Sequence, residues 1–268
     1  MSTAKSRKPT GHPGNLRLSK TSAFMRPYRL LAFDWDGTAV SDRSAPAPEA
    51  ASRIATLSGL GVWSAVITGT KYENLERKFF LLIRPDRRWR VTACMNRGSE
   101  VFGFDRAGVC ALEYRREATP QENRLMDEIA LAVQKELLEN HGLETRIVFD
   151  RLNRRKLDLI PEPAWADPPK ERIGELMNAV NDRLRRGQVQ GGIRHVLDRV
   201  ERLAEQRGIT LRLTSDVKHV ELGLTDKSDS VHYLIDTLAR PRGISADDVA
   251  ILGDEFGPID GIEGSDFK

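Results

Sequence analysis

The chain has 268 residues and a formal net charge of +3, with 40% hydrophobic and 30% charged side chains. A chain of this length can bury a sizeable core in one or two domains. It contains no apolar run close to the roughly 20 residues that span a bilayer, so we expect no transmembrane segment and no membrane partner. Two cysteines, Cys94 and Cys110, give neither a disulfide framework nor a metal-site spacing, which favours a cytoplasmic protein.

The positive charge is concentrated at the start of the chain. Residues 1 to 30 carry seven basic side chains and no acidic one, so the rest of the chain is mildly acidic. Because residues 1–25 are polar and rich in Pro, Gly, Ser and Lys, we predict a disordered basic tail there. The tail lacks the apolar core of a secretory signal, but its composition is compatible with an organelle-targeting peptide. A nucleic-acid-binding arm is a further alternative, and we favour a solvated tail.

Strand and helix patterns alternate over residues 26–114. Short apolar runs, each followed by a turn and a helical pattern, are typical of a doubly wound, Rossmann-like α/β fold with a parallel sheet. The expected elements are a strand over 30–33, a helix over 50–60, a strand over 62–67, a helix from 72 to about 83, a strand over 91–95 and a hairpin over 101–114 that turns at 105–108.

The alternation is lost over residues 115–222, where we predict a second, α+β domain inserted into the first. Its expected elements are an amphipathic helix over 121–140, strands over 145–149 and 157–160 around a basic turn, helices around 171–186 and 193–207, and strands over 210–213 and 219–222. The doubly wound pattern resumes over 223–268, with a helix opening at 225–230 and a buried strand over 249–252.

Polar side chains stand where three of these strands end and where one helix begins. The set, in chain order, is Asp34, Asp36, Thr68, Gly69, Lys227 and Asp254. Because the carboxyl ends of parallel strands meet at one edge of a sheet, we expect these groups to converge there. The set suits phosphoryl transfer. One aspartate can attack phosphorus, a second acid can protonate the leaving oxygen and later activate water, and Mg²⁺ can neutralise carboxylate and phosphate charge.

Each member of the set also has a structural alternative. Asp36 before Gly37, and likewise Asp254, are compatible with ordinary Asx turns. Thr68 is compatible with a helix cap, which would not prevent it from binding phosphate. Lys227 is compatible with an exposed helix start, although the helix dipole disfavours a cation in the first turn. Four sites in order favour the functional interpretation over these alternatives.

The motifs that carry these residues resemble those of the haloacid dehalogenase superfamily of phosphatases and phosphomutases. They are Asp34-Trp35-Asp36-Gly37-Thr38, Val66-Ile67-Thr68-Gly69, Lys227 and Gly253-Asp254. The resemblance implies that Asp34 is the nucleophile and Asp36 the general acid and base. It also implies that Thr68, Gly69 and Lys227 bind the phosphate and that Asp34, Asp36 and Asp254 bind Mg²⁺. An acid at position 36 favours phosphate esters over the dehalogenase branch of the family.

The long insert between Thr68 and Lys227 resembles that of family members with an α/β cap, such as sugar-phosphate phosphatases and phosphomannomutases. Asn96-Arg97-Gly98 resembles the turn that often precedes this cap. We expect the cap to exclude water and to contact the leaving group. We expect the basic segment of the cap to determine substrate specificity. A solvated hairpin tip without a role in binding is an equal alternative. The candidate specificity residues are Arg151, Asn153, Arg154, Arg155 and Lys156.

The end of the chain departs from the family pattern. A second acid usually follows soon after the fourth motif, but Pro258 stands at one common spacing. We assign Asp266 as a further metal ligand and keep Asp260 in reserve. Relatives continue through a further strand and helix beyond the position of Lys268, so we expect the second part of the core to be truncated there.

These observations predict a Mg²⁺-dependent phosphatase that acts on a small phosphomonoester, with a sugar phosphate as the expected substrate, through an aspartyl phosphate. A phosphomutase of the phosphomannomutase type is the first alternative. A catalytically weak binding or regulatory protein is the second. The expected partner is a small-molecule phosphate ester rather than a nucleic acid, and the sequence does not indicate an oligomeric state.

Overall fold

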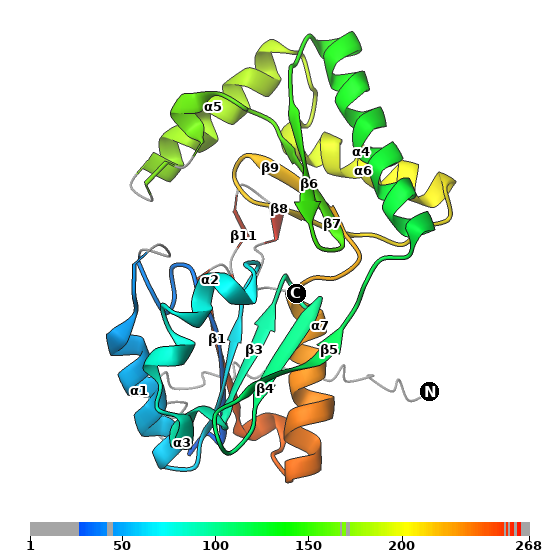
Figure 1. Ribbon diagram of the computed structural model, residues 1–268. Coiled ribbons are helices and arrows are strands. Elements are labelled where there is room, and N and C mark those ends of the chain that lie inside the picture. The colour runs from blue at the N-terminus through cyan, green and yellow to red at the C-terminus, as the bar shows by residue number, and fades with distance from the viewer. Residues whose placement is uncertain are drawn as a thin grey trace, which may run out of the picture.

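The computed structural model describes residues 27–41, 45–166, 168–169, 172–254, 256, 258–259 and 262–263. They form a core around a six-stranded sheet and a smaller cap around a four-stranded sheet (Figure 1). The predicted basic tail over residues 1–25 lies outside the described residues. Within them, no helix is both long enough and apolar enough to cross a membrane.

The core sheet has the strand order β10-β1-β2-β3-β4-β5. The first four strands run parallel, whereas β4 and β5 add to the edge as an antiparallel hairpin that turns at Asp105–Gly108. The strands are β1 (Leu30–Asp34), β2 (Trp63–Ile67), β3 (Val91–Met95), β4 (Glu100–Phe104), β5 (Cys110–Arg115) and β10 (Val249–Leu252). The predicted α/β fold class, with a doubly wound core, is therefore confirmed.

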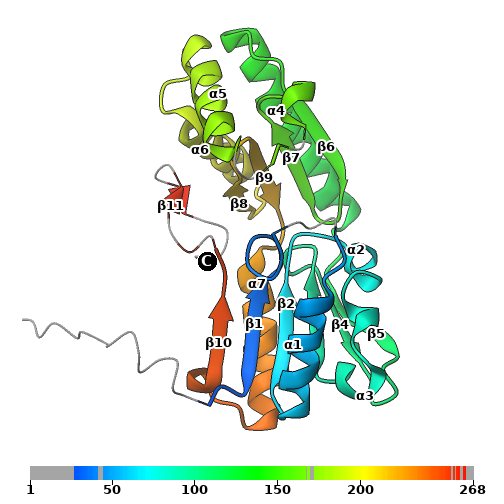
Figure 2. The same ribbon diagram turned by 90° about the vertical axis from the view of Figure 1, so that its left-hand side faces the viewer.

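Helices cover both faces of the core sheet (Figure 2). On β1, Leu30 and Ala32 pack with Leu234 and Leu238, while Phe33 packs in a second cluster with Ile54. Alternate residues of a strand point to opposite faces, so this separation places α1 and α7 on opposite sides of the sheet. The helices are α1 (Pro48–Gly59), α2 (Tyr72–Glu76), α3 (Pro85–Arg88) and α7 (Lys227–Tyr233), the last continuing as a π-helical segment over Leu234–Ala239.

The prediction of one helix from 72 to about 83 is wrong. Helix α2 ends at Glu76, and a 3₁₀ turn over Phe80–Leu82 precedes α3. Phe79 and Phe80 are both fully buried, and their rings lie 4.9 Å from Trp35 and 5.3 Å from Tyr72, respectively. Both rings pack in the core cluster that also contains Trp35 and Tyr72, and the chain leaves the helical path where they do so.

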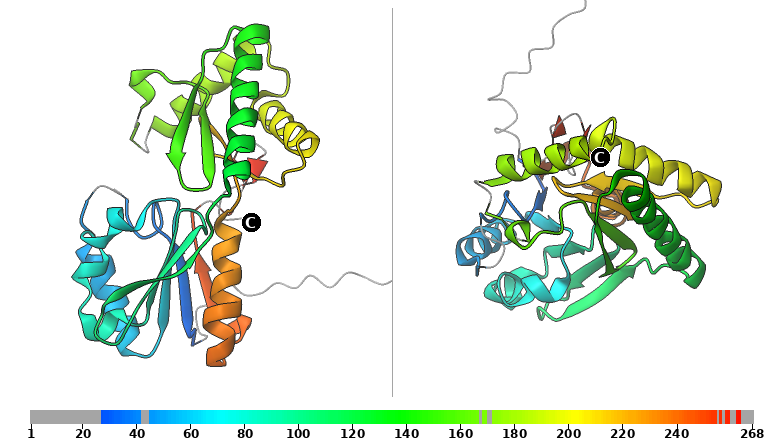
Figure 3. Two further views of the ribbon diagram at one scale, coloured as in Figure 1. Left: turned by 45° about the vertical axis from the view of Figure 1, so that its right-hand side comes forward. Right: turned by 90° about the horizontal axis from the view of Figure 1, so that it is seen from above.

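The cap is an antiparallel sheet with helices on one face. The strand order is β6-β7-β9-β8, and the strands are β6 (Arg146–Arg151), β7 (Arg154–Asp158), β8 (Arg212–Ser215) and β9 (His219–Gly223). Helices α4 (Pro120–His141), α5 (Ile173–Arg186) and α6 (Gly192–Gln206) bury an apolar cluster with Leu157, Val220 and Leu222 of the sheet. The other face of the sheet is polar and lies over the carboxyl-end edge of the core (Figure 3).

The predicted basic turn between the two cap strands is wrong. Strand β6 extends to Arg151 and β7 begins at Arg154, so the turn contains only Leu152 and Asn153, the latter with φ of 56°. Arg154 and Lys156 lie within a strand because the polar face of the cap sheet supplies carboxylates that pair with them. Strand β8 also begins two residues later than we expected.

Close contacts join the two core segments to each other, and to the cap, where the chain passes between the two domains. Ser99 Oγ in the core lies 2.6 Å from Thr225 Oγ1 and accepts a hydrogen bond of 3.0 Å from Asn153 Nδ2 of the cap. Gly98 has φ of +83°, and a Cβ there would lie 2.5 Å from the backbone oxygen of Asp226. We keep 26–114, 115–222 and 223–268 as the proposed limits of the core, cap and returning core segments.

Candidate active site

The predicted polar set gathers at the carboxyl-end edge of the core sheet. Asp34 is the last residue of β1, and Thr68 follows β2, which pairs with β1 in parallel up to Asp34 and Ile67. Lys227 is the first residue of α7, and Asp254 follows β10, the neighbour of β1 on its other side. Three parallel strands and one helix therefore bring the four motifs to one place.

Asp34 and Lys227 contact each other directly. Lys227 Nζ donates a hydrogen bond of 2.9 Å to Asp34 Oδ1, and both residues are less than a tenth exposed. Lys227 is therefore buried, and the alternative that it is an exposed residue at the start of a helix is wrong. Asp226 caps α7 by accepting from Ser228 N, and Asp229 completes a capping box, so two anionic side chains at the helix start interact favourably with the helix dipole that the Lys227 cation opposes.

A tight turn carries Asp36 beside Asp34. Trp35 between them is 1% exposed and packs into the core, while its backbone oxygen accepts from both Ala39 N and Val40 N. Gly37 completes the turn with φ of +93°, a conformation that L side chains rarely adopt. Anchored in this way, the turn holds Asp36 at the rim of the same cavity as Asp34.

Thr68 is buried and takes part in the turn that follows β2. Its backbone N–H donates to Cys94 O at 3.0 Å, and its Oγ1 accepts from Thr70 N at 3.3 Å. The side chain is 1% exposed and borders the cavity together with Gly69. This geometry agrees with a structural role for Thr68 in the turn, which was the alternative to a functional role.

The acidic residues at this edge have the donor chemistry that Mg²⁺ prefers. Asp34, Asp36 and Asp254 supply carboxylate oxygens, which are hard ligands. Asp254 is exposed, and its Oδ1 accepts a hydrogen bond of 3.4 Å from Thr38. Across the described ranges, no three acidic, His or Cys side chains converge as a ready-made metal cluster. Asp266 and Asp260 lie outside the described residues.

A cavity of about 520 Å³ opens between this edge and the polar face of the cap. The core contributes Asp34, Asp36, Thr68 and Lys227, and the cap contributes residues of β6 and β7 and the loop before β9. Its cationic lining side chains are Lys78, Arg97, Arg151, Arg154, Lys156 and Lys227. Such a wall is suited to a substrate that carries negative charge.

The predicted specificity residues separate into two groups. Arg151, Arg154 and Lys156 line the cavity, whereas Asn153 and Arg155 do not. Asn153 donates to Ser99 and Arg116 O and accepts from Ala118 N at 2.7 Å, so it holds the linker to the cap.

Arg155 points toward the cap helices. It pairs with Asp127 through Nε and donates to Asn123 Oδ1 at 3.2 Å. Because neighbouring residues of a strand face opposite sides of the sheet, Arg154 and Arg155 cannot both reach the cavity.

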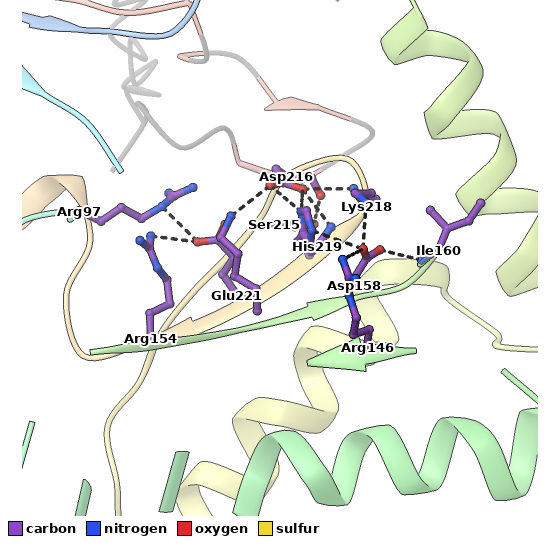
Figure 4. A network of polar contacts seen from close by, with 11 residues as sticks. Arg97, Arg146, Arg154, Asp158, Ile160, Ser215, Asp216, Lys218, His219 and Glu221 are labelled. Carbon is purple, nitrogen blue, oxygen red and sulfur yellow. Dashed lines mark hydrogen bonds and ion pairs between the residues drawn. The ribbon is translucent and has the colours of Figure 1, made fainter. Parts of the chain in front are cut away.

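Sequence reasoning did not find Glu221 and did not assign Arg97 to the site. Glu221, on β9, is 1% exposed and forms ion pairs with Arg97 at 3.1 Å, Arg154 at 3.1 Å and Lys156 at 2.5 Å (Figure 4). Arg97 comes from the core, so this contact joins core and cap. The available signals were a single acid within the apolar strand pattern at 219–222 and an arginine in the turn that precedes the cap.

The cations determine the charge state of this cluster. Burial acts to raise the pKa of Glu221, but the charges of Arg97, Arg154 and Lys156 outweigh burial and lower the pKa to about 2. Burial lowers the pKa of Arg154 to about 10, against the opposing charge of Glu221. Glu221 and Arg154 are therefore both charged near neutral pH, and three basic side chains contact the one carboxylate of Glu221.

Sequence comparison identifies no relative, because no protein-family model and no curated protein matches the chain. Solved structures do match. An IMP-bound, N-terminally truncated Plasmodium falciparum IMP-nucleotidase aligns with a TM-score of 0.59 and 14% identity, over 90% of this chain and 61% of that one. The ATP-bound form of that protein aligns with the same TM-score and identity over 90% of this chain and 54% of the other.

The chain thus spans about three fifths or less of the length of these neighbours. At 14% identity the likeness concerns the fold, and it covers both the core and the cap of this chain. The architecture of a parallel core with an inserted α/β cap agrees with the four motifs. The chain therefore shares its fold with these IMP-nucleotidase structures, and this fold agrees with the resemblance of the four motifs to the haloacid dehalogenase superfamily.

Proposed function

We propose that the chain is a Mg²⁺-dependent phosphatase that hydrolyses a small phosphomonoester through an aspartyl phosphate on Asp34. The observation that carries the proposal is the Asp34 carboxylate, which is buried, lies 2.9 Å from Lys227 Nζ and borders a cavity with cationic walls. A buried carboxylate is unfavourable without a partner, and the Lys227 ammonium is proposed to supply that partner and to orient the carboxylate for attack.

The proposed reaction has two steps. An Asp34 carboxylate oxygen attacks phosphorus while the bond to the ester oxygen breaks, and Asp36 donates a proton to that leaving oxygen. Asp36 then removes a proton from water, which attacks the phosphorus and releases phosphate and free Asp34. Thr68, the N–H of Gly69 and Lys227 are proposed to hold the phosphate oxygens, because all three border the cavity beside Asp34.

Mg²⁺, when bound, neutralises charge on the carboxylates and the phosphate. Asp34, Asp36 and Asp254 are the described residues proposed to hold it, since each offers an oxygen ligand at the same edge of the sheet. Asp266, outside the described residues, stays a prediction for a further ligand.

A sugar phosphate is the first proposed substrate. The cavity of about 520 Å³ is within the range of roughly 300–1,000 Å³ that small-molecule sites show. A nucleoside monophosphate is the second, because the IMP-nucleotidase that shares the fold has been solved with IMP bound. Phosphomutase activity remains the alternative reaction at the same residues, and a requirement for a bisphosphate activator would distinguish it.

Phosphate release tests the proposal directly. Sugar phosphates and IMP are supplied with Mg²⁺ or with a chelator to the wild type and to Asp34→Asn. We expect release that needs Mg²⁺ and that falls by at least about 1000-fold in the variant, because an amide oxygen is a poor nucleophile. Release that is equally fast in Asp34→Asn would refute the role of Asp34. A wild type that binds these esters without turnover would support the binding-protein alternative.

A further inference from the structure

The cationic side chains of the cavity exceed what a single phosphate monoester requires. Lys227 is already paired with Asp34 at the reacting edge. The other cationic lining residues are Lys78 and Arg97 from the core and Arg151, Arg154 and Lys156 from the cap. Among the described cap residues that line the cavity, the only acidic side chain is Asp216, and Glu221 pairs with Lys156 within the cluster. This half of the cavity therefore carries an excess of positive charge.

Arg97 connects the reacting edge to this basic half. Its Cγ lies 3.4 Å from the position that a Cβ on Gly69 would occupy, beside the proposed phosphate site. Its Nε lies 3.1 Å from Glu221 Oε2 in the cap. In Figure 4 the side chains of Arg97 and Arg154 lie side by side and both contact the carboxylate of Glu221. The carboxylate thus holds both groups in place and neutralises the charge of only one of them.

Donor groups remain for a ligand. Arg97 Nη1, Arg151 Nε and Arg154 Nε are buried and have no hydrogen-bond partner in the described part of the chain. A buried donor without an acceptor costs about 1–3 kcal/mol, and more when it is charged. Three such donors on side chains that line one cavity indicate that an acceptor with negative charge belongs between them.

The backbone at Arg97 is held in an unfavourable conformation. Asn96 and Arg97 both have φ of 51°, in the left-handed region that non-glycine residues rarely occupy. Hydrogen bonds of 3.0 Å from Asn96 N to Thr70 O and from Arg97 N to Thr68 O keep them there. Such strain persists where the surrounding structure enforces it, and here it directs Arg97 toward the cavity.

We propose that the leaving group of the substrate carries an acidic group of its own, either a carboxylate or a second phosphate, which Arg97 binds together with Arg151 and Arg154. This inference rests on the proposed phosphatase function and narrows its substrate class to phosphate esters with a second anion. Arg97 is then a specificity-determining residue, because it contacts the leaving group from the core while the two cap arginines contact it from above.

Three esters with one carbon skeleton test the inference. Glucose 6-phosphate has a neutral leaving group, 6-phosphogluconate adds a carboxylate and glucose 1,6-bisphosphate adds a phosphate. We expect kcat/KM to be about 10- to 100-fold higher for at least one acidic ester than for the neutral one, mainly through a lower KM, as for a hydrogen bond between charged groups. The better of the two acidic esters identifies the kind of anion.

Substitution of Arg97 assigns the effect to this residue. Arg97→Gln should reduce the preference for the acidic ester by about 10-fold, whereas Arg146→Gln should retain it. Arg146 is the matched control, since it also pairs with a cap carboxylate but is 65% exposed and lies outside the cavity lining. A preference that survives Arg97→Gln, in protein shown by circular dichroism to be folded, overturns the assignment.

Calorimetric binding to Asp34→Asn separates this inference from the proposed reaction. Tighter binding of the acidic esters without any turnover by the wild type would defeat the phosphatase proposal and retain the anion site. Turnover of all three esters, or of IMP, with no preference for an acidic leaving group in either assay would defeat the inference and retain the phosphatase.

Discussion

The two walls of the cavity hold their charged groups in different ways. In the core, charges stand at the ends of apolar strands, and Asp34 meets Lys227 across 193 residues of sequence. In the cap, charges lie within the strands and pair across the sheet, where Lys156 on β7 stands opposite Glu221 on β9. The core places its charges by topology, whereas the cap places them by cross-strand pairing.

This difference has an energetic consequence. The charged side chains of the core site stand at the ends of their elements, and Asp34 pairs with Lys227, which belongs to a helix rather than to a neighbouring strand. Their substitution therefore leaves the cross-strand side-chain contacts of the core sheet intact. The cap cluster is part of its sheet, and removal of one partner leaves buried charge behind. We therefore expect substitutions in the cap cluster to affect mainly stability. Substitutions on the core wall should affect mainly turnover, with an added loss of stability where one partner of the buried Asp34–Lys227 pair is removed.

In the comparison of the two walls, the largest effect is expected for Lys227→Met. Loss of the ammonium from Asp34 and from the phosphate site should lower kcat/KM by about 100- to 1000-fold. Lys218→Met is a closely matched control, because Lys218 Nζ also lies 2.9 Å from a buried aspartate, Asp158, but in the cap and outside the cavity lining. It should lower the midpoint of urea unfolding and leave kcat/KM within a few-fold. If Lys227→Met and Lys218→Met lose equal activity, the expectation that the core residues determine turnover and the cap residues determine stability is wrong.

Glu221→Gln should produce the largest loss of stability. The variant leaves Arg97, Arg154 and Lys156 close together without their carboxylate, which should cost about 3–4 kcal/mol of unfolding free energy in urea titration. Glu136→Gln removes a carboxylate from a more exposed pair with Arg199 and should cost less than about 1 kcal/mol. If the two variants lose equal stability, burial does not determine the strength of the cap cluster.

The pH dependence of the unfolding free energy should reflect the ionisation of Glu221. The pKa of Glu221 is about 2 in the folded chain against an ordinary value of 4.5. The stabilisation from its ionised form is therefore complete above about pH 4.5 and is lost as the pH falls toward 2, a contribution of about 3 kcal/mol. Unfolding free energies measured across this window should fall more steeply for the wild type than for Glu221→Gln. Parallel curves would mean that Glu221 has an ordinary pKa.

The smallest effect is expected at the cap turn. Asn153→Gly retains a residue suited to the φ of 56° but removes the side-chain contacts with Ser99, Arg116 and Ala118. We expect a loss of about 1–2 kcal/mol in thermal unfolding and an unchanged ratio of kcat/KM between acidic and neutral esters. An altered ratio would show that Asn153 acts on the substrate, as the sequence first suggested.

Strand-end residues could be predicted because their position follows from local patterns. The apolar run before Asp34 identifies a buried strand, and the order of the four motifs places their residues at one edge. The structure confirms the resulting fold class. The same reasoning located the polar set that includes Thr68 and Lys227, whose chemical roles stay predictions.

The cap charges could not be placed in this way. A strand with Arg154, Arg155 and Lys156 in succession has no period-two apolar pattern, so it was interpreted as a turn. The formation of a strand here depends on Glu221, which pairs with Arg154 across 67 residues of sequence. The break between α2 and α3 was missed for a related reason, because adjacent Phe79 and Phe80 fill a core that only tertiary packing defines.

The most direct test of the account is covalent trapping at Asp34. The wild type is quenched in acid during turnover of its best ester with Mg²⁺, reduced with borohydride and examined by peptide mass spectrometry. An aspartyl phosphate is an acyl phosphate, which borohydride reduces to an alcohol, so the account predicts homoserine at position 34 only in samples that received substrate. Turnover with Asp34 unmodified, or with the modification at Asp36 instead, would contradict it.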